Sequence, residues 1–305
     1  MPEPRRRIFV VGERGQVARA LGRECTARGH TIHLAGRATV DIADRAALAA
    51  AVSRFRPDIV VNAAAYTAVD AAEDDAERAL MLNRDGAANV AAAALSAGAP
   101  LIQISTDYVY DGNKQSPYVE TDPPCPLGVY GASKLAGEKA VSAIGGNPII
   151  LRTSWVCSPD GNNFVKTMLR LAGQREEIGV VDDQWGSPTF ASDLAHAIVS
   201  IAEVLLSSRD RTSLAGVYHA AGAGETTWCR FARAIMQGSA DKSGPSCRVR
   251  AIATAEYPTR AKRPVNSSLD CSKLARIFGI RLPPWQNSLD ICLDQLLTAS
   301  QRVST

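Results

Sequence analysis

The sequence predicts an α/β fold built on a parallel β-sheet with helices on both faces. Five apolar runs of strand length alternate with helical patterns between the N-terminus and about residue 155, which is typical of a doubly wound sheet. The first run leads through a glycine turn directly into a helix, the Rossmann-type arrangement for a dinucleotide phosphate. Beyond residue 155 the alternation becomes irregular, so we expect a smaller C-terminal region there.

The composition limits the class of protein. The 305 residues are 46% hydrophobic, enough for a sizeable core. No apolar run reaches the roughly 18 residues of a membrane-spanning helix, and the run after the basic residues 1–7 is too short for a secretory signal. The net charge of +3 is too small to indicate nucleic acid as the main partner. We therefore expect a cytoplasmic protein that binds neither membrane nor nucleic acid.

The cysteines and histidines give no sign of a metal centre. The seven cysteines and four histidines are scattered, with no C-x-x-C pair. We expect reduced thiols and no bound metal.

The predicted strands are short and apolar, as in sheets that are buried on both faces. They cover Ile8–Val11, Thr31–Ala35, Ile59–Asn62, Leu101–Ile104 and Ile149–Leu151. Helical patterns fill the intervals, running towards Ala27, over Arg45–Phe55, from about Ala76 to Ala97 and from Tyr130 to about Ser142. We expect residues 1–155 to form a dinucleotide-binding domain.

The turn after the first strand is a candidate phosphate site. Gly12 and Gly15 stand in the spacing G-x-x-G-x-x-A, and Gln16 and Val17 follow at the start of the helix. Glycine lets the backbone approach a diphosphate, and a helix N-terminus presents free N–H groups to it. Taken alone, the motif is also compatible with an ordinary tight turn.

The second strand ends in Gly36-Arg37 rather than in an acidic residue. An acid at this point holds a ribose 2′-hydroxyl, whereas an arginine accommodates a 2′-phosphate. Arg37 and Arg14 therefore favour NADPH, with NADH possible, although two solvated loop arginines would give the same pattern. Asp41 and Ile42 are candidates to flank the adenine.

Polar residues follow the next two strands. The third strand runs into Ala65, Tyr66 and Thr67, at the edge where cofactors lie in such sheets. The fourth runs into Thr106 and Asp107. A hydroxyl at this strand end is placed to bind a substrate oxygen.

Tyr130 and Lys134 stand four positions apart at the start of a predicted helix. Such residues lie on one face about a turn apart. A free phenol titrates at roughly 10, and a nearby positive charge favours the phenolate. The pair can therefore serve as a proton donor near neutral pH, although Y-x-x-x-K also occurs by chance in many helices.

The C-terminal region, residues 156–305, mixes helices with polar turns. Helices are predicted over Val165–Ala172, Ala191–Ser207, Thr227–Met236, Ser272–Phe278 and Ser288–Ala299, with a strand at Val217–Ala220. Residues 180–189 are interpreted as turn-rich, and residues from about 190 to 220 are expected to pack back on the sheet. His219 is interpreted as a core or edge histidine. The basic loop Tyr257–Ser267 is placed to close over an anionic ligand or to lie solvated on the surface.

These segments together resemble the extended short-chain dehydrogenase/reductase superfamily and, within it, the dTDP-4-dehydrorhamnose reductase family. The resemblance covers nearly the whole chain, from Gly12 to about Trp285. Its motifs include Val61–Thr67, Ser105–Tyr110, Tyr118-x-Glu120-x-Asp122, Val129–Glu138, Arg152–Val156, Gly161–Phe164, Asp183–Thr189 and Arg263-Pro264-x-Asn266-Ser267. It implies reduction of the 4-keto group of a dTDP-keto-sugar in the last step of dTDP-L-rhamnose synthesis.

The resemblance also implies roles for single residues. Tyr130 would protonate the sugar oxygen, Lys134 would bind the nicotinamide ribose and lower the phenol pKa, and Thr106 with Asp107 would bind the reacting sugar. Trp155 would stack against the sugar or wall it, and residues 156–305 would be mainly a substrate-binding region. The nucleotide–diphosphate side would involve Asn163, Phe164 and the loop with Arg263 and Asn266. The implied cofactor contacts are Gly15, Gln16, Val17, Asp41, Ile42, Ala65, Tyr66 and Thr67.

Some positions depart from the family pattern. Ala18 replaces a usual glycine. Some relatives form a dimer bridged by magnesium, but Ala20 and Ser192 stand where glutamates would be needed, so magnesium is not expected. The chain is expected to be a monomer or a homodimer. The alternative functions are another nucleotide-sugar 4-ketoreductase or epimerase, and a non-catalytic regulatory subunit on the same fold.

Overall fold

The computed structural model describes residues 5–303, with side chains to residue 298. Its centre is a six-stranded sheet in the order β10-β5-β4-β3-β1-β2. The strands are β1 (Arg7–Val11), β2 (Thr31–Ala35), β3 (Ile59–Asn62), β4 (Leu101–Thr106), β5 (Ile149–Thr153) and β10 (Gly216–His219). Every neighbouring pair is parallel. The predicted doubly wound α/β sheet is confirmed.

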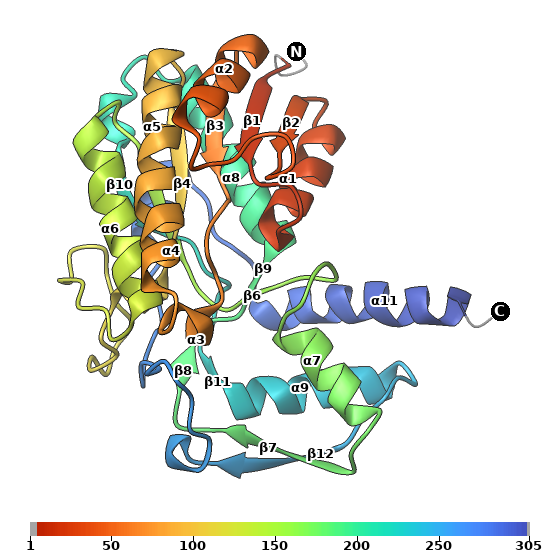
Figure 1. The fold of residues 1–305 in the computed structure, drawn as a ribbon. Helices are drawn as coiled ribbons and strands as arrows, with labels where there is room; N and C mark the ends of the chain where they lie inside the picture. Colours follow the sequence, from red (N-terminus) through yellow and green to blue (C-terminus); the bar gives the residue numbers. More distant parts are fainter. Residues whose placement is uncertain (1–4, 304–305) are drawn as a thin grey trace.

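Helices cover both faces of the sheet (Figure 1). One face packs against α1 (Gln16–Ala27), α8 (Ala191–Ser207) and α10 (Ser272–Phe278). The other packs against α2 (Arg45–Phe55), α5 (Gly86–Ser96) and α6 (Val129–Ile144). The strand order changes direction between β1 and β3, and ligands bind at such switch points beyond the carboxyl ends of the strands.

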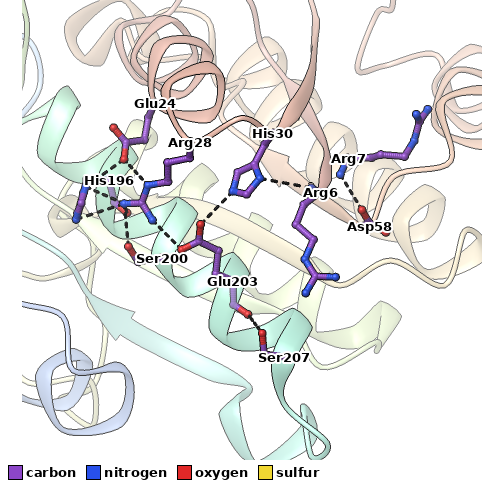
Figure 2. A network of polar contacts seen from close by, with 10 residues as sticks. All are labelled: Arg6, Arg7, Glu24, Arg28, His30, Asp58, His196, Ser200, Glu203 and Ser207. Carbon is purple, nitrogen blue, oxygen red and sulfur yellow. Dashed lines mark hydrogen bonds and ion pairs between the residues drawn. The ribbon is translucent and has the colours of Figure 1, made fainter. Parts of the chain in front are cut away.

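A polar network fastens α8 to α1 (Figure 2). Arg28 lies 2.7 Å from both Glu24 and Glu203, and His30 Nε2 lies 3.0 Å from the other oxygen of Glu203. His196 completes the cluster through Arg28 and Glu24. Because α8 follows the irregular segment in sequence, this network fixes how the chain returns to the sheet.

The predicted helix from Ala76 to Ala97 is interrupted. It consists of α4 (Ala76–Leu80), the π-helical turn η1 (Met81–Asp85) and α5, after a short α3 (Val69–Ala72). In η1, Asn83 donates to the Tyr66 carbonyl and to the Ser133 hydroxyl, and accepts from the Tyr66 amide. The widened turn therefore holds α6 against the loop after β3, as π-turns often do beside functional sites.

The C-terminal region builds a second layer. Here β6 (Val156–Cys157) pairs with β9 (Thr189–Phe190), β7 (Glu177–Val181) with β12 (Arg248–Ile252), and β8 (Trp185–Gly186) with β11 (Thr226–Thr227). The helices α7 (Phe164–Ala172), α9 (Trp228–Asp241) and α11 (Trp285–Val303) pack around these strands in a separate core. Short 3-10 turns lie at Asp107–Val109, Thr212–Leu214 and Thr254–Glu256.

The sequence analysis of this region was incomplete. Besides the expected turns, residues 180–189 contain the end of β7 together with β8 and β9, and β12 was not predicted. Strands of two residues are too short to show a period, and β12 exposes Arg248 and Arg250 on an edge. Among the described residues, no helix has the length and apolarity needed to cross a membrane.

The close approach of α6 to η1 can be tested at Gly137. A Cβ at this position would collide with the carbonyl oxygen of Asn83 and lie 3.2 Å from its carbonyl carbon. Because both are backbone atoms, we expect Gly137→Ala to lower the free energy of unfolding by about 1–3 kcal/mol. Urea denaturation measures this. The control Gly173→Ala has φ −73° and ordinary contacts, so equal losses in both variants would contradict the packing argument.

Candidate active site

A trough crosses the carboxyl edge of the sheet. Its inner part is a cavity of about 530 Å³ bordered by Thr106, Tyr130 and Lys134. Its outer part, of about 670 Å³, is bordered by the glycine turn and the end of β2. Both parts share Arg14, Gly15, Ala63, Ala64, Ala65 and Thr67. The sheet therefore brings the predicted proton donor and the predicted phosphate turn into one continuous site.

The glycine turn fits its predicted role. Gly12 has φ +120°, and a Cβ there would lie 3.3 Å from the Ala63 backbone. The Gly12 amide donates to the Ala35 carbonyl at 2.8 Å, which holds the turn beside β2. Gly15 precedes the first residue of α1, so the free N–H groups of this helix start face the trough.

The predicted cofactor residues are distributed over both parts of the trough. The outer part alone is lined by Gly12, Arg37, Asp41 and Ile42, the inner part alone by Gln16, Val17, Tyr130 and Lys134, and both parts by Gly15, Ala65 and Thr67. Tyr66 borders neither part and holds Asn83 through its backbone. Tyr66 thus positions the loop after β3 rather than facing the trough.

Tyr130 sits at the start of α6, over the end of β4. Although part of its ring borders the cavity, protein surrounds it, and burial raises the pKa of its phenol to about 12, against a lowering effect from the Thr106 hydroxyl. The Tyr108 ring meets it edge-on at 5.6 Å. The phenol is therefore protonated at neutral pH and can give a proton to an oxygen beside Thr106.

Lys134 is buried one turn further along α6, 5% exposed. Its ammonium donates to the Ile104 carbonyl at 2.7 Å. Burial lowers the pKa of Lys134 to about 8, and Glu138 opposes that shift. The phenol pKa responds to burial, Thr106 and Asp107. The role in lowering the phenol pKa that the resemblance implies for Lys134 stays a prediction.

Glu138 and Arg152 form a buried ion pair below the site, which the sequence reasoning missed. Arg152 Nε and Nη2 lie 3.0 and 2.6 Å from the two Glu138 oxygens, and Ser105 donates to the same carboxylate. Arg152 also donates to the Tyr110 hydroxyl at 2.7 Å. The available signal was an arginine inside an apolar strand and a glutamate four residues after Lys134.

The histidine His219 ends this network as a core residue. Its Nδ1 lies 3.1 Å from the Asp270 carbonyl and its Nε2 2.8 Å from the Tyr110 hydroxyl. A carbonyl only accepts, so Nδ1 carries the proton. Burial, with Arg152 nearby, lowers the pKa of His219 to about 4. The interpretation of His219 as a satisfied core histidine is confirmed.

Asp107 faces the cavity with one oxygen free. Thr106 donates to its Oδ1 at 3.0 Å, whereas Oδ2 has no hydrogen-bond partner among the described residues. The residue is 1% exposed, and burial raises the pKa of its carboxyl to about 6, against lowering effects from the nearby Ser267 and Thr106 side chains. Thr153, the register partner of Thr106 on β5, also has a buried hydroxyl without a partner in this part of the chain. Both groups can receive ligand hydroxyls.

Trp155 forms the far wall of the cavity. It has φ +46°, and its ring stacks on Trp228 at 3.5 Å with an interplanar angle of 8°. Gly186 makes room for it, since a Cβ there would lie 2.7 Å from the indole nitrogen. The C-terminal region thereby presents a flat aromatic wall to the site.

Four further predicted substrate residues lie outside the cavity lining. Asn163 begins α7 by accepting from the Lys166 amide, and it donates to Gln16 at 2.9 Å. Phe164 packs on Trp228 at 4.6 Å. Asn266 donates to the Lys114 carbonyl at 2.8 Å and borders a separate pocket. These three build the frame of the site.

Arg263 reaches the site over the Tyr108 ring, 5.9 Å from its centroid. Its Nη2 donates to Asp70 at 2.7 Å, while its buried Nη1 has no partner among residues that the structure describes. Arg260 pairs with Asp74, and the Ala261 amide donates to Asp70. The basic loop therefore lies docked on α3 and the turn after it.

The metal expectation concerns two positions. Ala20 is buried in α1 at 3% exposure, and Ser192 lies at the start of α8. In the described part of the chain, no group of three or more histidine, cysteine, aspartate or glutamate side chains is arranged to hold a metal ion.

A parallel sheet with a glycine turn at its switch point and a tyrosine–lysine pair in the cavity defines an oxidoreductase of the extended short-chain dehydrogenase/reductase type. The family model described as RmlD substrate binding domain matches residues 6–298. A dTDP-4-dehydrorhamnose reductase of Sinorhizobium fredii is 47% identical over 282 residues, 92% of this chain and 95% of the relative. The chain belongs to the dTDP-4-dehydrorhamnose reductase family.

Two other relatives agree. The dTDP-4-dehydrorhamnose reductase of Burkholderia thailandensis is 43% identical over 96% of this chain and 99% of its own length. A crystal structure of dTDP-4-dehydrorhamnose reductase from Bacillus anthracis, in complex with NADP, superposes with a TM-score of 0.87 at 36% identity, covering 96% of this chain and 100% of that one.

Asp107 gives a pH-dependent test of the site. Its folded pKa of about 6 lies above the ordinary 3.8, so the ionised form destabilises the fold as pH rises towards about 6. We expect the free energy of unfolding of Asp107→Asn, relative to that of the parent, to increase by about 1 kcal/mol between pH 5 and pH 7.5. Urea denaturation at both pH values measures the difference. A gain that does not change with pH would show that Asp107 keeps an ordinary pKa.

Proposed function

We propose that this chain reduces the 4-keto group of dTDP-4-dehydro-L-rhamnose to give dTDP-L-rhamnose, the last step of dTDP-rhamnose biosynthesis, with Tyr130 as proton donor. The observation that carries the proposal is the protonated Tyr130 phenol beside Thr106, in a cavity that continues into the glycine-turn trough. The names of the relatives support the substrate class.

The trough fits a nicotinamide dinucleotide. Gly12 and Gly15 leave space for a diphosphate, the start of α1 offers N–H groups, and Arg37 with Arg14 suits a 2′-phosphate. When bound, NADPH or NADH supplies the hydride. The complex of the Bacillus anthracis relative with NADP supports this choice. Gln16, Val17, Asp41, Ile42, Ala65 and Thr67 line the proposed cofactor site.

The chain itself supplies the proton of the proposed reaction. As the carbonyl carbon receives hydride, its oxygen gains negative charge, and Tyr130 transfers its phenolic proton to that oxygen. Thr106 holds the oxygen in line, and the resulting phenolate is reprotonated from solvent. Lys134, charged below its pKa of about 8, binds the nicotinamide ribose. Atoms and charge then balance without a metal ion.

Buried polar atoms without a hydrogen-bond partner among the described residues are proposed to bind the sugar and its diphosphate. Asp107 Oδ2 is placed to accept from a sugar hydroxyl, and Arg263 Nη1 is placed to donate to a phosphate oxygen. Trp155 offers its stacked ring as a wall for the sugar. Asn163, Phe164 and Asn266 remain on the proposed nucleotide–diphosphate side as frame residues. A cytoplasmic location and a monomeric or homodimeric state stay predictions.

Two other functions would each be favoured by a specific experimental result. A rate on dTDP-4-dehydro-L-rhamnose no better than on other keto-sugars would favour another nucleotide-sugar ketoreductase or an epimerase. A non-catalytic subunit would bind the same nucleotides without oxidising NAD(P)H. The deciding measurement is the oxidation of NADPH and NADH, followed spectrophotometrically with dTDP-4-dehydro-L-rhamnose made enzymatically.

Tyr130→Phe tests the proton donor. Phenylalanine keeps the ring and its packing against Tyr108 but removes the hydroxyl. We expect kcat to fall by about 10²–10⁴-fold, because general acid catalysis is lost. Cofactor affinity should stay within about threefold, within the usual effect of one weak contact. Unchanged NAD(P)H oxidation in this variant would rule out the proposed mechanism.

Lys134 predicts the pH dependence of cofactor use. We expect kcat/KM for NADPH to decline as pH rises through about 8, because the lysine loses its charge there, while Tyr130, with a pKa of about 12, stays protonated. Steady-state rates from pH 6.5 to pH 9.5 test this. In Lys134→Arg the charge persists, so the decline should disappear even if the rate is lower. A parent profile that is flat to pH 9.5 would contradict the assignment.

A further inference from the structure

An acidic side chain lies at the end of β2, although it comes from another segment of the chain. Glu13, the residue after Gly12 in the first turn, lays its side chain across Gly36. A Cβ added at Gly36 would overlap the Glu13 carboxylate and lie 2.8 Å from Glu13 Cβ. Gly36 therefore makes room for this carboxylate, which reaches the place where an acid at the end of the second strand ordinarily stands.

Glu13 shares this place with two cations. Glu13, Arg14 and Arg37 all border the outer part of the trough. All three are exposed, and among residues 5–303 none of their side chains makes a hydrogen bond or ion pair. Apolar Val40, Ile42 and Leu82 border the same pocket and suit a flat base. One negatively charged and two positively charged side chains are therefore free to contact a ligand beside the pocket that suits its base.

We propose that Glu13 determines the balance between NADH and NADPH, an inference that rests on the nicotinamide cofactor of the proposed function. The Glu13 carboxylate accepts hydrogen bonds from the 2′- and 3′-hydroxyls of an adenosine ribose. A 2′-phosphate at the same place meets a like charge and is held only by Arg14 and Arg37. Glu13 favours NADH, and the two arginines favour NADPH.

Direct cofactor binding tests this without the sugar. The dissociation constants of NADPH and NADH are measured by nucleotide fluorescence with the full chain. Glu13→Gln keeps the shape of the side chain and removes its charge. We expect the preference for NADPH over NADH to rise about tenfold, the effect of roughly 1.4 kcal/mol of like-charge repulsion.

Two matched variants test the direction of the expected change in cofactor preference. Arg37→Ala should shift the preference towards NADH, because the 2′-phosphate loses a partner. Gly36→Ala should act like Glu13→Gln, because its methyl group displaces the carboxylate from the end of β2. The ratio of the two constants is measured within each variant, so a partial loss of folded protein cancels.

The outcomes separate this inference from the proposed function. A preference in Glu13→Gln that stays within about twofold of the parent, or moves towards NADH, overturns the role of Glu13 while leaving the reductase intact. If neither nucleotide binds the parent chain, the proposed function and this inference both fail. A rise in Glu13→Gln and Gly36→Ala with a fall in Arg37→Ala supports the inference.

Discussion

The geometry of the active site depends on one buried ion pair. Glu138 and Arg152 are 5% and 4% exposed, and removing charges from water is costly unless each is paired and fully hydrogen-bonded. The pair meets this condition through two contacts with each other, a donation from Ser105 and a contact with Tyr110. It fixes the position of α6 relative to β4 and β5, so Tyr130 lies over Thr106 and Lys134 over Ile104.

The π-turn η1 supplies a second constraint, on a neighbouring face of α6. Its Asn83 binds Ser133 of α6 and the backbone of Tyr66, and Gly137 allows the close contact. The helix that bears Tyr130 and Lys134 is therefore held by a buried ion pair and by a buried amide. Both devices are polar, which selects one arrangement of the helix more strictly than apolar packing alone.

The site itself is left incompletely satisfied. Asp107 Oδ2, Thr153 Oγ1 and Arg263 Nη1 are buried without partners among the described residues. Such groups cost stability in the folded chain. Asp107 and Thr153 line the cavity proposed for the keto-sugar, where ligand atoms can satisfy them. Trp155, backed by the stacked ring of Trp228, borders the same space with a surface that needs no hydrogen bonds.

The sequence by itself determined the sheet, the glycine turn after its first strand and the tyrosine–lysine pair on one helix. Strands such as Ile59–Asn62 are marked by continuous apolar runs, Gly12 and Gly15 by their position between strand and helix, and Tyr130 and Lys134 by helical spacing. These are local patterns, and local patterns are visible in sequence.

Only the tertiary structure decided the rest, because it depends on residues far apart in the chain. Glu13 after β1 meets Gly36 after β2, Glu138 of α6 meets Arg152 of β5, and Trp155 after β5 meets Trp228 of α9. The strands β8 and β9 exist only through such partners, since two residues carry no period of their own. Burial, which sets the pKa of Tyr130 and Lys134, is likewise a property of the packed fold and not of the spacing.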